Sequence, residues 1–145
     1  MLNKFGFHHF IFALLPVSLL FLDNIAHIPI NDIFIPLGLS LIPSIILWVL
    51  LTYFIGTKKS SVIVSFLIIL LLIFAYTRSA LIYHEIDELR IIAKNIILMP
   101  IFSVMGIFGI IYILRKDFSS NITSIINVVS VTVVILIIFQ IGLFS

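Results

Sequence analysis

The chain has 145 residues, of which 63% are hydrophobic and 10% are charged, with a net charge of +2 and no cysteine. An average soluble domain is about half apolar and about a quarter charged, so a chain of this length could not bury so much apolar surface in water. The composition predicts an integral membrane protein and gives no reason to expect nucleic acid. The lack of cysteine excludes disulfides, thiolate metal sites and cysteine nucleophiles.

Five apolar segments approach the length of about 20 residues that a helix needs to cross a bilayer. Their approximate bounds are 5–22, 33–55, 60–76, 95–114 and 122–144. They are continuous apolar runs without the alternation of a membrane β-barrel, so we expect helices. The sequence therefore predicts an all-α integral membrane bundle of five transmembrane helices, with residues 1–145 forming a single transmembrane domain.

The first segment also has features of a secretory signal peptide, because Lys4 precedes an apolar core over residues 10–22. It lacks a small-x-small cleavage site and Asp23 follows directly, so we interpret it as a retained first span. His8 and His9 near its start diverge by about 100° on a helix. We interpret them as side chains at the membrane surface rather than as a chelating pair.

The segments between the spans predict the orientation of the chain. Five positive charges fall on one side: Lys4, Lys58, Lys59, Arg115 and Lys116. The other side holds most of the acidic residues, Asp23, Asp32, Glu85, Asp87 and Glu88. By the positive-inside rule the N-terminus is cytoplasmic and the C-terminus is outside, as an odd number of crossings also requires.

Contacts between spans are expected at small or polar residues, which allow close backbone approach or hydrogen bonds. The small residues are Ser40, Ser44, Gly106 and Gly109. Ser124, Asn127 and Ser130 form a polar stripe on the last span. We expect this stripe to hydrogen-bond to a neighbouring helix; a path for a substrate is the alternative.

The stretch TRSALIYHEIDELRIIAKN, residues 77–95, carries six of the fourteen charged residues. Within residues 79–93, apolar residues recur every three or four positions and charges occupy the opposite side. This pattern predicts a short amphipathic helix at the outer membrane interface. Its candidates for contact with lipid headgroups or a partner are Arg78, Tyr83, Arg90 and Lys94.

The same stretch holds the one candidate metal or acid–base site, formed by His84, Glu85 and Asp87. These residues lack the HExxH spacing that places two imidazoles on one helical face, so we favour the interfacial helix. The chain has no phosphate-binding loop and no GxSxG motif, and we expect neither a cofactor nor an enzymatic activity of its own. The spans lack a charged residue near their middle, which argues against a transporter.

Three runs, FALLPVSLLFLDNIAHI, KKSSVIVSFLIILLLIFAY and INVVSVTVVILIIFQI, resemble the N-terminal membrane region of sulfatase-like proteins of the alkaline-phosphatase superfamily. The resemblance covers residues 12 to about 141. Its better markers are Pro16-Val17, Asn24-Ile25 and Asn127-Val128-Val129. In those proteins the nucleophile and metal ligands belong to an outer domain, so the resemblance assigns no catalytic residue here.

The resemblance implies a non-catalytic membrane module that anchors or assists an outer enzyme acting on lipid headgroups or glycans. Such a module would be either a piece of a longer protein or a stand-alone relative. The alternatives are a small accessory subunit of a larger membrane complex and, less favoured, a transporter. The expected partners are membrane lipids and an outer enzyme domain or other membrane subunits, and the expected location is the cell membrane.

Overall fold

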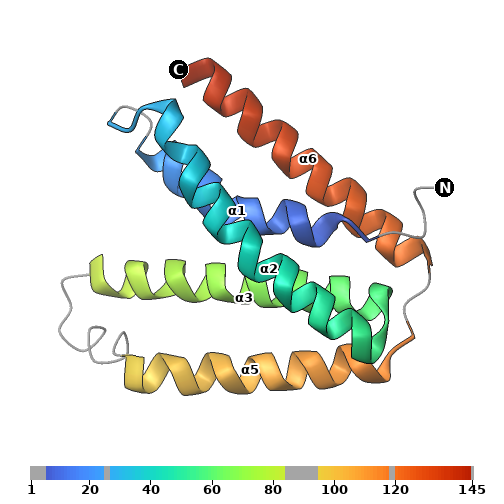
Figure 1. Ribbon diagram of the computed structural model, residues 1–145. Helices are drawn as coiled ribbons and strands as arrows, with labels where there is room; N and C mark the ends of the chain where they lie inside the picture. The colour runs from blue at the N-terminus through green and yellow to red at the C-terminus, as the bar shows by residue number, and fades with distance from the viewer. Residues whose placement is uncertain (1–5, 25–26, 84–94, 118–119, 145) are drawn as a thin grey trace. The chain divides into compact units, whose positions relative to one another are not determined.

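The computed structural model describes residues 6–24, 27–83, 95–117 and 120–144, and within these ranges the chain is helical with no strand (Figure 1). The α-helices are α1 (His8–Asp23), α2 (Phe34–Ile55), α3 (Thr57–Tyr83), α5 (Asn95–Arg115) and α6 (Ser120–Phe144). A short 3-10 helix, η2 (Ile30–Ile33), precedes α2. The prediction of an all-α helical bundle is confirmed.

Within the ranges that the structure describes, four apolar helical stretches are long enough to cross a membrane, namely Ile30–Ile55, Thr57–Tyr83, Ile96–Arg115 and Ile122–Phe139. α1 is also apolar but has 16 residues, which gives a length of about 24 Å against a hydrocarbon core of about 30 Å. The helices therefore support a multi-pass membrane protein. The first helix is shorter than the predicted span 5–22, because it begins at His8.

α3 extends further than the sequence predicted. The third span was expected to end at residue 76 and a separate interfacial helix to begin at residue 79, but α3 continues to Tyr83. Ala80 and Leu81 are strong helix formers, and the long Arg78 side chain can carry its charge away from the apolar region, so nothing in this stretch ends the helix. The rest of the predicted interfacial helix, from His84 on, lies outside the described residues.

The chain forms two compact units, which we describe separately. Unit 1 consists of Met1–Ser65 and Phe118–Ser145, and unit 2 consists of Phe66–Asp117. In unit 1, α1 packs against both α2 and α6 (Figure 1). Its buried apolar side chains are Phe12, Ala13, Leu15, Phe21, Val62, Ile63, Val64 and Ile137. α1 thus lies at the centre of this unit although it is the shortest of the α-helices in the described part of the chain.

In unit 2, the part of α3 after residue 65 packs against α5 (Figure 1). The rings of Phe74 and Phe102 meet edge to face with centroids 5.2 Å apart. A Cβ atom added to Gly109 would overlap the ring of Phe66. Because glycine has no side chain, α5 can approach α3 at this point, as predicted for small residues in the spans.

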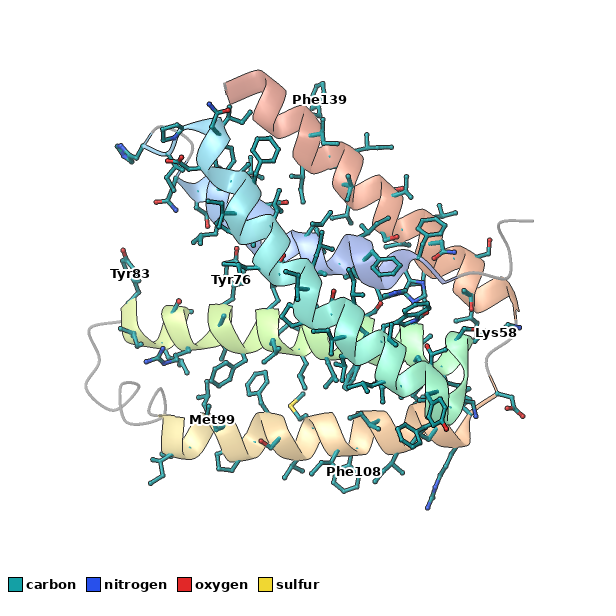
Figure 2. All side chains as sticks on the ribbon, viewed as in Figure 1. Lys58, Tyr76, Tyr83, Met99, Phe108 and Phe139 are labelled. Carbon is teal, nitrogen blue, oxygen red and sulfur yellow. The ribbon has the colours of Figure 1, made fainter. Side chains whose placement is uncertain are left out.

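The outer surfaces of both units are strongly apolar. Tyr53 and Phe54 on α2, Phe108 on α5 and Phe139 on α6 are all more than 60% exposed. Figure 2 labels Phe108 and Phe139 on their helices. Exposed apolar surface on this scale is unfavourable in water and is the surface that lipid would cover. The exposed apolar side chains therefore agree with the composition, which predicts a membrane protein.

Candidate functional site: a buried polar cluster in unit 1

Unit 1 buries a group of polar side chains near the first turns of α1, α3 and α6. We call it the polar cluster, and its members are His8, His9, Ser60, Ser61, Ser65, Thr123, Asn127 and Ser130. His8, His9, Ser60 and Ser130 have no exposed surface. Burying polar groups in an apolar protein is unfavourable unless they form hydrogen bonds, and polar groups inside membrane helices often mark function.

His8 on α1 and Asn127 on α6 form the central contact of the polar cluster. The Oδ1 atom of Asn127 accepts a hydrogen bond from the backbone N–H of His8 at 3.2 Å. The same oxygen lies 2.8 Å from Nδ1 of His8. Since Oδ1 carries no hydrogen, Nδ1 must carry the proton, and in a neutral imidazole this leaves Nε2 with a lone pair.

His9 faces a different helix. Its ring stacks on Trp48 of α2, with centroids 5.0 Å apart and an angle of 18° between the planes. Trp48 in turn donates from Nε1 to Oγ of Ser61 on α3 at 3.0 Å. Trp48 therefore joins α1 to the start of α3, through a stacked ring on one side and a hydrogen bond on the other.

Gly6, two residues before α1, lies against the polar cluster. A Cβ atom added there would lie 2.9 Å from Cε1 of His8 and 2.9 Å from Cβ of Ser61. Real Cβ atoms do not approach other atoms so closely, so the backbone of Gly6 fills this space completely. The close contact also shows that His8 and Ser61 lie next to the same point of the chain.

Three hydroxyl groups of the polar cluster bond to carbonyl groups three or four residues earlier in the chain. Ser60 donates to the carbonyl of Gly56 at 2.6 Å, Ser61 to that of Thr57 at 2.9 Å, and Ser130 to that of Asn127 at 2.8 Å. Such back-bonds satisfy a buried hydroxyl without a second helix. Within the described residues, the buried hydroxyls of Ser65 and Thr123 form no hydrogen bond.

The polar cluster corrects one interpretation made from the sequence and confirms another. His8 and His9 were expected at the membrane surface, but both rings are fully buried inside unit 1. The polar stripe on the last span was expected to bond to a neighbouring helix, and Asn127 does so. Ser124 is only half-buried, and Thr123, one turn before Asn127, lies on the buried face instead.

Sequence reasoning missed Thr123 and the pairing of His8 with Asn127. The signal for Thr123 was present, because Thr123, Asn127 and Ser130 are spaced by four and three residues and share one helical face. No local signal links His8 to Asn127, since the pair depends on how α1 packs against α6.

The site residues proposed from the charged stretch lie mostly beyond what the structure describes. His84, Glu85, Asp87, Arg90 and Lys94 fall outside the described ranges. Arg78 and Tyr83 are exposed on the last turns of α3, and Tyr83 projects outward with 90% of its surface free (Figure 2). Among the described residues, no group of three or more His, Asp or Glu is placed to hold a metal ion.

No model of a known protein family matches the chain, and neither does any curated protein or solved structure. The resemblance to the membrane region of sulfatase-like proteins therefore stays a prediction.

Proposed function

We propose that this protein is a non-catalytic, multi-pass membrane module that anchors or assists an outer enzyme acting on lipid headgroups or glycans. The observation that carries the proposal is that buried polar side chains join pairs of helices to one another. His8–Asn127 joins α1 to α6, and Trp48–Ser61 joins α2 to α3. Hydrogen bonds of this kind hold membrane helices together, which is what an anchoring module requires.

The orientation in this proposal places the basic ends of the helices in the cytoplasm. The contacts of His8 with Asn127 and of Gly6 with Ser61 gather the starts of α1, α3 and α6 at one end of unit 1. Lys58 and Lys59 lie one turn before Ser61 at that end. The positive-inside rule then supports a cytoplasmic N-terminus, with Asp32 and the end of α3 outside.

Site-specific photocrosslinking in the native host tests this function. A photoreactive phenylalanine at Tyr83 or Ile30, both exposed at the proposed outer ends, is compared with one at Lys58, exposed at the proposed inner end. We expect the outer positions, and not Lys58, to crosslink a protein that carries an outer phosphate- or sulfate-ester-processing domain. The absence of such a product from both outer positions contradicts the proposal.

A further photocrosslinking position, Tyr53, distinguishes the alternative function, a small accessory subunit of a membrane complex. The exposed apolar surface of α2, with Tyr53 and Phe54, offers a face to which another membrane helix could bind. Crosslinks from Tyr53 to one stoichiometric membrane subunit, with none from Tyr83 to an outer enzyme, would favour the accessory subunit.

A further inference from the structure

The end of α5 carries three hydrogen-bonding side chains on one face. Arg115 and Lys116 follow Tyr112 by three and four residues, a spacing at which side chains are neighbours on a helix. All three are exposed. The backbone N–H of Lys116 donates to the carbonyl of Tyr112 at 3.1 Å, so the helical hydrogen bonding continues one residue past the end of α5.

The ammonium group of Lys116 is held against Tyr112. Its Nζ atom donates to Oη of Tyr112 at 2.7 Å and lies 5.1 Å from the centre of the ring. Because a lysine ammonium has three N–H donors, two remain, and the Tyr112 hydroxyl keeps its own proton to donate. Arg115 adds a guanidinium group with five N–H donors. Such a set of donors, two of them cationic, suits a phosphate group.

An exposed apolar stripe on α5 leads to these donors. We call it the α5 stripe, and its members are at least 50% exposed and spaced by four, three and four residues: Ile101, Met105, Phe108 and Tyr112. This spacing keeps them on one face of the helix. The stripe is about 16 Å long at 1.5 Å per residue. That is close to half of a hydrocarbon core of about 30 Å, the depth that the acyl chains of one leaflet fill.

We propose that this face of α5 binds an anionic phospholipid. The phosphodiester accepts hydrogen bonds from Tyr112, Arg115 and Lys116, and one acyl chain lies along the α5 stripe. The inference is independent of the anchoring function proposed above. It rests on the contact between Lys116 and Tyr112, on the neighbouring guanidinium group and on the length of the exposed stripe.

Charge favours a lipid with a single negative charge. Arg115 and Lys116 are followed by Asp117, so residues 115–117 carry a net charge of +1. Phosphatidylglycerol, with one negative charge on its phosphodiester, complements this charge. Phosphatidylethanolamine carries an additional ammonium group and is neutral, so it gains less from the two cations.

The site differs from the lipid contacts predicted from the charged stretch. α3 and α5 run antiparallel, so Arg115 lies at the opposite end of unit 2 from Arg78 and Tyr83 (Figure 1). Tyrosine is enriched where a membrane helix reaches the headgroups, and basic residues are enriched on the cytoplasmic side. In the proposed orientation the lipid therefore belongs to the cytoplasmic leaflet.

Native mass spectrometry of the full chain in detergent tests the proposal. The delipidated protein is titrated with phosphatidylglycerol or phosphatidylethanolamine with the same acyl chains, and the affinity for the first bound lipid is compared. One Lys or Arg near the membrane surface contributes about 1 kcal/mol to binding of anionic lipid, which is ~5-fold in affinity. For a net charge of +1 we expect a ~5-fold preference for phosphatidylglycerol.

Variants locate the headgroup and the chain. Arg115→Gln/Lys116→Gln should abolish the preference and weaken phosphatidylglycerol binding ~25-fold, whereas Arg115→Lys/Lys116→Arg should keep the preference. Phe108→Ala should weaken both lipids equally and leave their ratio unchanged. Lys58→Gln, at an exposed lysine on α3, is the matched control for loss of positive charge and should behave as the wild type does.

Three results would overturn the proposal. The first is equal affinity of the folded wild type for the two lipids, a comparison that needs no variant. The second is a loss of preference in Lys58→Gln as large as in Arg115→Gln/Lys116→Gln, which would reflect general attraction to basic residues. The third is displacement of the lipid by glycerophosphoglycerol, the same headgroup without acyl chains, which would make a soluble phosphodiester the ligand.

Discussion

The Nδ1 atom of His8 and the Oδ1 atom of Asn127 lie 2.8 Å apart and join the start of α1 to α6 across 119 positions of the chain. Both residues are buried, so the contact is shielded from water. α1 has 16 residues and is shorter than the hydrocarbon core that it is proposed to cross. Its apolar length alone therefore stabilises it in the membrane less than that of a full-length span. The bond to Asn127 supplies a specific attachment for this helix.

Removing the Asn127 amide should destabilise the protein. Asn127→Ala eliminates an interhelical hydrogen bond, for which ~0.6 kcal/mol is average in membrane proteins and ~1.7 kcal/mol is high. It also leaves two donors of His8 buried without an acceptor, which raises the expected loss to about 1–3 kcal/mol of unfolding free energy. Unfolding followed by circular dichroism in detergent measures the change.

Thr132→Ala is the matched control for Asn127→Ala. The Thr132 side chain is exposed on the same helix, and its hydroxyl bonds to the carbonyl of Val128 in its own helix. We expect a change within about 0.5 kcal/mol. Equal stability losses in Asn127→Ala and Thr132→Ala would show that the contact with His8 contributes nothing specific.

Gly6 should not tolerate even one additional carbon atom. In Gly6→Ala the new Cβ would meet both His8 and the backbone-proximal Cβ of Ser61, neither of which can move freely. Overpacking of this kind costs about 1–3 kcal/mol. Gly38→Ala is the control, because nothing lies within 4 Å of its added Cβ and alanine favours the helix by up to ~1 kcal/mol. A Gly6→Ala protein as stable as Gly38→Ala would be incompatible with the described packing.

Gly109 allows a second close approach, in unit 2. Gly109→Ala should lower the unfolding temperature, because the added Cβ overlaps the ring of Phe66. Shortening that ring in the double variant Gly109→Ala/Phe66→Leu should recover part of the loss, since the two side chains then share the space. Losses that simply add in the double variant would mean that the two residues do not touch.

The helices themselves could be predicted because apolar length is a local property of the sequence. The predicted spans 33–55 and 95–114 agree with α2 and α5 to within one residue at each end. The error at the end of α3 has a physical cause. The third span was predicted to end at residue 76, just before the charged stretch, but the helix continues past Arg78 to Tyr83, because a charged side chain can extend out of the apolar region without ending the helix. The charged residues therefore do not predict where this helix ends.

The polar cluster could be predicted only in part. The stripe containing Asn127 was visible because its spacing is helical, and a polar stripe in an apolar helix requires a partner. That His8 and His9 are buried could not be predicted, because Lys4 nearby suggested the membrane surface and the partners Trp48 and Asn127 lie far along the chain. The environment of His8 and His9 depends on the packing of α1 between α2 and α6.

The central proposal is that α1 crosses the membrane as the longer helices α2 and α3 do, with the polar cluster at the cytoplasmic end. The natural chain has no cysteine, so single cysteines introduced at Lys4, Asp32, Lys58 and Tyr83 are unique labelling sites. With a membrane-impermeant maleimide, Asp32→Cys and Tyr83→Cys should react in intact cells, and Lys4→Cys and Lys58→Cys only after permeabilisation. Labelling of Lys4→Cys in intact cells, with Lys58→Cys still protected, would show that α1 does not cross and would contradict the claim.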